Sequence, residues 1–279
     1  MITVVLTIYT RGEYYKDALD SLASQSDQDF ELLIYSNIPV VYQLSKFKDV
    51  QLIHPEKEEM PLWIADALGR AKNFKIAFLD DDDTFSENKV LYMNSTNFGY
   101  FHNDYNHITP GSHNLGNGFN MSCISINKQY FPNLSETLKY NPDVVLIDSF
   151  VYWYALENNV PVTISKEKLT NYRFRNYKDL NSNAVSNMQI QIEKLKMLRK
   201  YFKSEKVQRI IRQRLIQNAL YLRSYGVPVN VNFLDVAWLM GQPQKNKVSL
   251  LATYFLTHPV FKGHGQMVID AIRNKKVRA

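Results

Sequence analysis

Phe74–Phe85 reads FKIAFLDDDDTF: a short apolar run, Ile76–Leu79, is followed at once by four consecutive carboxylates, Asp80–Asp83. Buried strands of α/β proteins read as short apolar runs, and ligands in such folds bind at the carboxyl ends of the strands. Adjacent like charges repel unless a cation lies among them, and clustered carboxylates suit hard ions such as Mg²⁺ or Mn²⁺. The stretch therefore predicts a central strand ending at a metal-assisted active site; the alternative is a solvated acidic turn.

The first third of the chain alternates between predicted strands and helices. Ile2–Tyr9 and Phe30–Tyr35 are apolar and predict buried strands, and Tyr14–Ser24 has apolar residues at helical spacing. Ala65–Lys72 predicts a helix that leads into the strand at Ile76–Leu79. A β-α-β order favours crossover helices. We therefore predict an α/β fold with a mostly parallel sheet of the Rossmann type, flanked by helices.

The remainder of the chain predicts two further strands and then helices. The strands are Phe98–His102 and Met121–Ile126, separated by a loop rich in Gly and Asn, Thr109–Asn120. Helices are predicted at Asp148–Glu157, Met188–Phe202, Lys206–Tyr225, Leu234–Leu239 and Val248–Leu256. The polar segment Asp179–Asn187 predicts a boundary between a first domain, residues 1–182, and an α-helical C-terminal segment, residues 183–279.

Composition narrows the class of protein. The 279 residues suffice for one large domain or two modest ones, and the single cysteine, Cys123, fits a reducing compartment. The opening MITVVLTIYT lacks the features of a signal peptide, and no apolar run approaches the roughly 18 residues of a membrane span. The net charge of +6 is mild and no nucleic-acid-binding motif is present. We expect a cytoplasmic protein with no nucleic-acid partner.

The basic helices of the C-terminal segment leave two possibilities open. Met188–Tyr225 predicts two amphipathic helices whose apolar faces pack on the first domain or on a partner. Their basic faces are either solvated or rest on the inner face of a membrane.

Several phrases of the first domain, taken in order and spacing, resemble the inverting family 2 glycosyltransferases of the GT-A fold. The phrases are Thr7–Arg11 (TIYTR), Leu19–Gln25 (LDSLASQ), Asp29–Asn37 (DFELLIYSN), Ile76–Asp83 (IAFLDDDD), Ile147-Asp148 before SFVYWYAL, and Tyr172–Ser182 (YRFRNYKDLNS). The resemblance covers residues 1–182. It implies a GT-A-like fold with a nucleotide-sugar half, residues 1–103, and an acceptor half, residues 104–182.

The resemblance also implies a reaction and its residues. A sugar would move with inversion from a nucleotide-sugar donor, a UDP- or GDP-sugar first of all, to a hydroxyl of a glycan, lipid-linked or protein acceptor. Asp80 and Asp82 would form the D-x-D pair that holds Mn²⁺ or Mg²⁺, with Asp82 as the ligand. A divalent cation on the diphosphate stabilises the leaving group. Asp148 would be the general base that takes the proton of the attacking hydroxyl; its other reading, which does not exclude the first, is a helix N-cap.

The donor and acceptor sites implied by the resemblance involve several further residues. The nucleotide-sugar site comprises Thr7, Tyr9, Arg11, Asn37, Asp80, Asp81, Asp83 and Arg175, and the acceptor or sugar loop comprises Asn114, Gly116, Asn117 and Gly118. Tyr9 either stacks on the base or is a core tyrosine. Arg11 either pairs with phosphate or forms a surface salt bridge. The glycines of the loop either permit close approach to a ligand or form a plain turn.

The chain departs from the family pattern at three places. Ser36-Asn37 stands where the family has an acid that reads the base, although Asn can both donate and accept. Ile64–Ala67 (IADA) does not match the family's donor-binding element. Arg175 stands where a His often completes the metal site; Arg cannot ligate a cation but can bind diphosphate.

Two other classes of protein remain open. Asp80–Thr84 satisfies the D-x-D-x-T motif of haloacid-dehalogenase-type phosphatases, in which Asp80 would be the nucleophile and Asp82 the acid/base. The chain could also be a non-catalytic protein that binds nucleotide sugars. Turnover of a nucleotide sugar, release of phosphate from simple esters, or neither, would separate the three.

Overall fold

The computed structural model describes residues 1–9, 13–108, 120–144, 146–173, 184–242 and 254. The chain divides into two compact units, Met1–Arg175 and Asn176–Ala279. The predicted boundary after residue 182 lies in residues 174–183, outside the described ranges, and stays a prediction. The division of the first domain into halves at residue 103 also stays a prediction. Of the described helices, none is long and apolar enough to cross a membrane.

The first unit is built on an eight-stranded sheet with the order β3-β2-β1-β4-β7-β6-β8-β5. Its strands are β1 Ile2–Ile8, β2 Phe30–Ser36, β3 Val50–Ile53, β4 Lys75–Asp80, β5 Thr84–Phe85, β6 Tyr100–His107, β7 Ile124–Asn127 and β8 Val162–Tyr172. The first four strands in the order are parallel to one another. β7 runs antiparallel to both β4 and β6, β6 and β8 are parallel, and β5 is antiparallel to β8. The predicted α/β sheet is therefore confirmed, with a fully parallel first half and a mixed second half.

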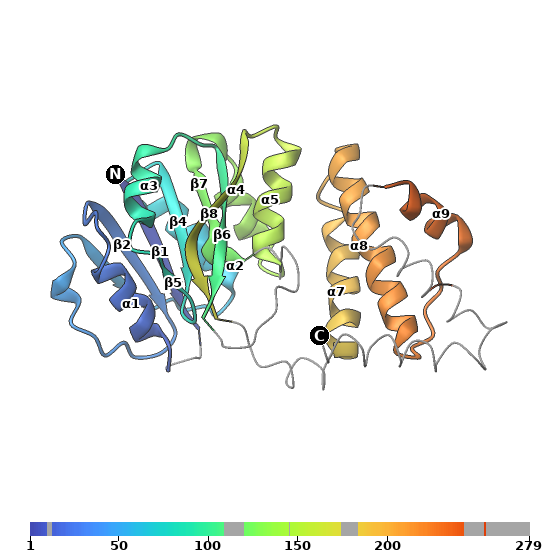
Figure 1. The fold of residues 1–279 in the computed structure, drawn as a ribbon, viewed down its shortest axis with the longest axis horizontal. Helices are drawn as coiled ribbons and strands as arrows, with labels where there is room; N and C mark the ends of the chain where they lie inside the picture. Colours follow the sequence, from blue (N-terminus) through green and yellow to red (C-terminus); the bar gives the residue numbers. More distant parts are fainter. Residues whose placement is uncertain (10–12, 109–119, 145, 174–183, 243–253, 255–279) are drawn as a thin grey trace. The chain divides into compact units, whose positions relative to one another are not determined.

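Helices lie on both faces of this sheet (Figure 1). They are α1 Tyr15–Ala23, α2 Met60–Arg70, α3 Lys89–Ser95, α4 Leu134–Tyr140 and α5 Ile147–Glu157, with short 3₁₀ turns η1 Leu44–Lys46, η2 Met121–Cys123 and η3 Lys128–Tyr130. α1 and α3 share a core with β1, β2 and β4. On the other face, Trp63 of α2 stacks on Tyr35 of β2, and Tyr152 of α5 contacts Tyr100 of β6.

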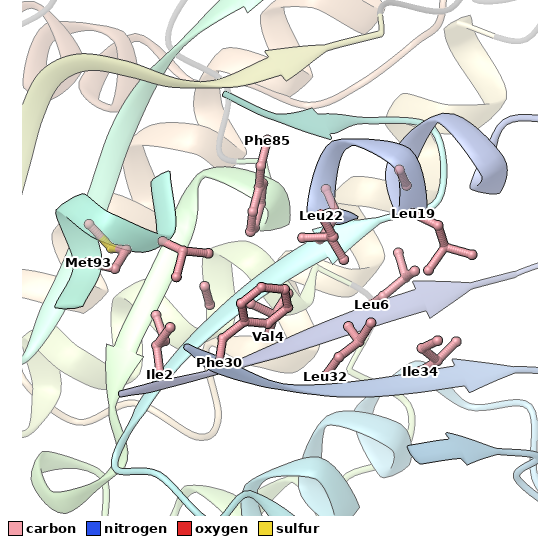
Figure 2. Close-up of a cluster of buried hydrophobic side chains, with 14 of the residues drawn as sticks. Ile2, Val4, Leu6, Leu19, Leu22, Phe30, Leu32, Ile34, Phe85 and Met93 are labelled. Carbon is pink, nitrogen blue, oxygen red and sulfur yellow. The ribbon is translucent and has the colours of Figure 1, made fainter. Parts of the chain in front are cut away.

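The core explains why the strand predictions hold. β1 and β2 are buried along their whole length because helices cover both faces, so they read as continuous apolar runs. Alternate residues of β1, Ile2, Val4 and Leu6, point to one side of the sheet, where Leu19 and Leu22 of α1 and Met93 of α3 complete the core (Figure 2). Figure 2 also shows Phe30, Leu32 and Ile34 of β2 on the same side.

Several elements differ from the sequence-based expectation. Met121–Ile126 was expected to be a strand throughout, but its first three residues form η2, because Asn120 caps that turn by accepting the N–H of Ser122 at 2.8 Å. α2 begins five residues before the expected Ala65, with Pro61 in its first turn, where proline favours a helix start. The strands β3, β5 and β8 and the helices α3 and α4 were not expected.

The second unit contains three described helices, α7 Ala184–Leu198, α8 Glu205–Ser224 and α9 Phe233–Gly241, as the amphipathic pattern predicted. Ser204 caps α8 by accepting the N–H of Val207, and Asn232 caps α9 by accepting the N–H of Asp235. Apolar residues of the three helices, among them Ile192, Leu220 and Val236, form a core of their own. The expected helix at Val248–Leu256 lies outside the described residues apart from Tyr254.

Membrane contact by this unit stays a prediction with a direct test. Phe233 and Leu234 at the start of α9 are 59% and 75% exposed, and α8 carries several basic side chains. If these features seat the unit on a bilayer, the protein is expected to co-sediment with vesicles containing anionic lipid at low salt and to be released by added salt. Failure to bind such vesicles at low salt would remove membrane contact and leave solvated basic faces.

Candidate active site

The four carboxylates Asp80–Asp83, here called the acidic turn, lie at the end of the central strand β4, as predicted. Asp80 is the last residue of β4, and Thr84 begins β5. The N–H of Asp83 donates to the carbonyl of Asp80 at 3.2 Å, which closes the turn, and the N–H of Asp80 donates to Ser122 Oγ at 3.0 Å. Since β1 and β2 run parallel to β4, their carboxyl ends lie at the same edge of the sheet.

The end of β1 contacts the acidic turn directly. Thr7 Oγ1 donates to Asp80 Oδ1 at 3.2 Å, and the backbone N–H of Tyr9 donates to Asp81 Oδ2 at 2.9 Å. Four predicted site residues, two from each segment, are thus brought together by the pairing of β1 with β4. The contact also explains why Asp81 is buried, with 4% of its surface exposed.

The four carboxylates alternate in exposure. Asp80 and Asp82 are partly exposed, whereas Asp81 and Asp83 are buried. Asp83 accepts the backbone N–H of Arg173 at 2.9 Å and the side-chain amide of Asn120 at 3.0 Å. Two acids therefore serve as internal anchors, and the other two are the pair that a ligand can reach.

Burial and mutual repulsion raise the pKa values of carboxyl groups in this turn and so oppose its full ionisation. Burial raises the pKa of Asp80 well above its usual value, and Asp83, Asp82 and Asp81 raise it further. Burial also raises the pKa of Asp83 to about 6, against the lowering effect of the hydrogen bonds from Arg173, Ser122 and Asn120. A positive charge beside these groups favours their ionised form.

The described residues contain no group of three or more His, Cys, Asp or Glu side chains arranged to hold a metal ion. Mg²⁺ and similar ions commonly use one or two carboxylates together with the phosphates of a substrate, rather than a closed protein cage. The partly exposed carboxylates of Asp80 and Asp82 fit that kind of site.

Arg173 at the end of β8 joins the acidic turn to α1, which the sequence analysis did not anticipate. Its Nε donates to the carbonyl of Asp82 at 3.0 Å, and its terminal nitrogen pairs with Asp17 at 2.7 Å. Its guanidinium also lies 4.3 Å from the ring centroid of Tyr14. Arg173 stands in the phrase YRFRNYKDLNS, of which the sequence-based prediction names Arg175 instead. Several predicted site residues lie outside the described residues: Arg11, Arg175 and the loop residues Asn114, Gly116, Asn117 and Gly118.

An aromatic stack lies beside the turn at the ends of β1 and β2. Tyr9 is 37% exposed, and its ring centroid lies 5.6 Å from that of Trp63, which stacks in turn on Tyr35 at 6.4 Å. Tyr9 is therefore a partly exposed ring backed by buried rings and not a core tyrosine. Trp63, which no motif marked, is the residue that holds it.

Asn37 follows β2 at the same edge of the sheet and is partly exposed. Its neighbour Ser36 is buried, and the Ser36 hydroxyl donates to the carbonyl of Ile38 at 2.7 Å. Of these two residues, Asn37 is the more accessible.

Asp148 lies in the first turn of α5, and the alternative reading of it as the N-cap is wrong. The N-cap is Leu146, because helical backbone begins at Ile147. The Asp148 carboxylate accepts the N–H of Ser149. It also lies close enough to Tyr100 to raise, together with burial, the pKa of that hydroxyl. Its role as general base stays a prediction.

Comparison with known proteins places the fold. No protein-family model matches the sequence. An uncharacterized glycosyltransferase of Rickettsia bellii is 26% identical over 147 residues, which cover 49% of this chain and 21% of that protein. One of Rickettsia felis is 30% identical over 122 residues, covering 38% and 19%. The matched part therefore spans about a fifth of the length of these curated relatives.

Two solved structures resemble the model over most of their length. Mannosyltransferase PcManGT from Pyrobaculum calidifontis, in complex with GDP-Man and Mn²⁺, has a TM-score of 0.55 at 12% identity, covering 98% of this chain and 86% of that one. S. aureus TarS 1–349, in complex with UDP-GlcNAc, has a TM-score of 0.53 at 13% identity, covering 92% and 81%. The chain thus has a GT-A-like fold, shared with glycosyltransferases.

The buried Asp83 leads to a testable pH dependence. An acid whose pKa is higher in the folded than in the unfolded protein binds more protons when folded, so its contribution to stability falls as pH rises between the two values. For Asp83 these are 3.8 and about 6, a difference worth up to about 3 kcal/mol. As pH rises through this window, the wild type is expected to lose the stability that protonated Asp83 contributes, whereas Asp83→Asn is not. The free energy of unfolding of Asp83→Asn, relative to that of the wild type, should therefore increase.

The measurement is denaturant unfolding of both proteins at a series of pH values. Asp27→Asn is the control, because a hydrogen bond from Asn94 lowers the pKa of Asp27 and puts its transition below that window. A constant difference between Asp83→Asn and the wild type across the window would contradict the raised pKa.

Proposed function

We propose that this protein is a glycosyltransferase that moves a sugar from a nucleotide-sugar donor to an acceptor hydroxyl with inversion. The observation that carries the proposal is the acidic turn at the end of β4, with Asp80 and Asp82 partly exposed and Tyr9, which follows β1, hydrogen-bonded to Asp81. The GT-A-like fold and the relatives named glycosyltransferases support it.

In this proposal the ends of the parallel strands bind the donor. The base stacks on Tyr9, which Trp63 holds in place, and Asn37 hydrogen-bonds its edge. The neighbours in complex with UDP-GlcNAc and with GDP-Man support a UDP- or GDP-sugar as donor.

Asp80 and Asp82 hold Mn²⁺ or Mg²⁺ together with the donor diphosphate, which the neighbour in complex with Mn²⁺ supports. When bound, the cation offsets the negative charge that develops on the leaving diphosphate. Thr7, by donating to Asp80, and Arg173, by binding the backbone of Asp82, hold the pair in place.

The acceptor hydroxyl loses its proton to Asp148 as it attacks the anomeric carbon of the donor. A single displacement on the face opposite the diphosphate inverts that carbon. The proposed acceptor is a hydroxyl of a glycan, a lipid-linked molecule or a protein.

The experiment that tests the proposal is a thermal-shift panel of UDP-, GDP-, CMP- and dTDP-sugars with and without Mn²⁺, followed by a transfer assay with the donor that binds. A ligand that binds the native state raises the melting temperature. Release of phosphate from simple esters would point instead to the phosphatase, and binding without turnover to a non-catalytic binding protein.

Tyr9→Ala is expected to weaken nucleotide affinity roughly tenfold or more, since base–aromatic stacking is worth about 1–3 kcal/mol. The contact of residue 9 with Asp81 survives the change, because it uses the backbone N–H. The measurement is titration of UDP or GDP by calorimetry. Tyr130→Ala, which truncates a comparably exposed tyrosine on η3, is the matched control. Equal affinities of the two variants would remove Tyr9 from the site.

A further inference from the structure

Lys89, the first residue of α3, is a completely buried lysine, with 0% of its surface exposed. Its Nζ donates to the carbonyl of Ser122 at 2.6 Å and to Thr170 Oγ1 at 3.0 Å, and it lies 3.9 Å from the ring centroid of Phe85. Lysine is almost never fully buried unless it is paired.

This position is unfavourable for a positive charge. Among the described residues no carboxylate lies within 4.0 Å of Lys89 Nζ, so the ammonium is buried without an ion pair. It also lies at the amino end of a helix, where the backbone dipoles favour negative charge. Burial lowers the pKa of Lys89 to about 7, whereas the negative charge of Asp83 favours its protonated form. The two hydrogen bonds and the Phe85 ring offset part of the cost of burying this charge, and a negative charge nearby would offset more of it.

All three partners of Lys89 border the acidic turn. Ser122, whose carbonyl accepts from Lys89, also receives the N–H of Asp80 on its hydroxyl. Phe85 follows Asp83 by two residues. Thr170 precedes by three residues Arg173, the backbone of which binds Asp83.

The acidic turn concentrates negative charge, which is also unfavourable, because its carboxylates repel one another and two of them are buried. In a medium of low dielectric, opposite charges attract at distances well beyond an ion pair. A buried ammonium whose partners border the turn is therefore placed to attract the carboxylates of the turn.

We propose that Lys89 is a positioning residue, an internal cation that stabilises the acidic turn by its charge without touching a ligand. The inference rests on the proposed function, in which the acidic turn holds the metal ion and the donor diphosphate. Its test, however, reads stability and requires neither a metal nor a donor.

The test is a double-mutant cycle of Lys89→Met and Asp82→Asn, measured by thermal unfolding with EDTA at a pH just below the Lys89 pKa of about 7. Methionine keeps the length of the side chain and removes its charge. We expect Asp82→Asn to raise the melting temperature of Lys89→Met by about 2–4 °C more than it raises that of the wild type. A lysine that only fills space and hydrogen-bonds would give additive effects.

Lys75→Met is the matched control. Lys75 Nζ also donates to backbone carbonyls, those of Met93, Asn94 and Thr96, but at the opposite end of β4 from the turn. Its effect should be additive with Asp82→Asn. If Lys89→Met is not recovered folded, the combination with Asp82→Asn should be recovered.

Additivity of the Lys89 and Asp82 changes, or equal coupling in the Lys75 control, would overturn the proposal. The proposal would also be overturned if the double variant, Lys89→Met with Asp82→Asn, were as unfolded as Lys89→Met alone. The outcome is separate from the proposed function, because a charge-specific coupling without sugar transfer would support the role of Lys89 and reject the transferase.

Discussion

Asp148→Asn is expected to lower the turnover of sugar transfer by roughly 10²–10⁴-fold, because a general base acts in the transition state. Donor affinity should stay near that of the wild type, since the base does not contact the nucleotide. The fold should also persist: the Asn side-chain oxygen can accept the N–H of Ser149 as the carboxylate does. The measurement is kcat and the donor dissociation constant of both proteins.

Asp143→Asn is the matched control for this change. Asp143 is an exposed acid in the same part of the chain, just before α5, and its loss should leave turnover nearly unchanged. Near-normal transfer by Asp148→Asn would refute the assignment. A large loss in Asp143→Asn, or in Asp104→Asn, would then identify the base.

Asp82→Ala is expected to abolish metal-dependent binding of the donor while leaving the protein about as stable as before. Asp82 is partly exposed, and its charge contributes to the raised pKa of Asp80, so its removal relieves repulsion within the turn. The main-chain bond from Arg173 to Asp82 uses the carbonyl and survives. The measurement is the shift in melting temperature caused by UDP- or GDP-sugar with Mn²⁺.

Glu87→Ala removes an exposed negative charge shortly after the turn and serves as the control. It should keep the full metal-dependent shift. An undiminished shift in Asp82→Ala would show that this carboxylate is not a ligand, whereas equal losses in both variants would point to net charge alone.

Much of the first unit could be predicted because burial on both faces leaves a direct trace in the sequence. β1 and β2 are continuous apolar runs, and the abrupt change from Leu79 to Asp80 marks the end of β4. The short elements α3 and α4 were missed, since seven residues are too few to establish a helical period. β8 was missed because much of it is solvent-exposed and carries charged side chains.

The site was predicted where its residues follow a strand and not where they depend on distant contacts. The family resemblance placed Thr7 and Tyr9 in one site with the acidic turn, and the pairing of β1 with β4 brings them into contact. Nothing local in the sequence shows that Trp63 supports Tyr9 or that Arg173 reaches Asp17, because each pair joins separate elements.

The sequence by itself determined the α/β class, the strand that carries the acidic turn, and the helical nature of the second unit, since these follow from hydrophobic period and strand ends. The tertiary structure alone decided which of the four acids are buried anchors and which are partly exposed. Adjacent aspartates are chemically identical. Donors from distant segments, the N–H groups of Tyr9 and Arg173 and the amide of Asn120, make Asp81 and Asp83 anchors and leave Asp80 and Asp82 partly exposed. It also decided that Lys89 is buried, because a lysine in a sequence is expected at the surface until the fold encloses it.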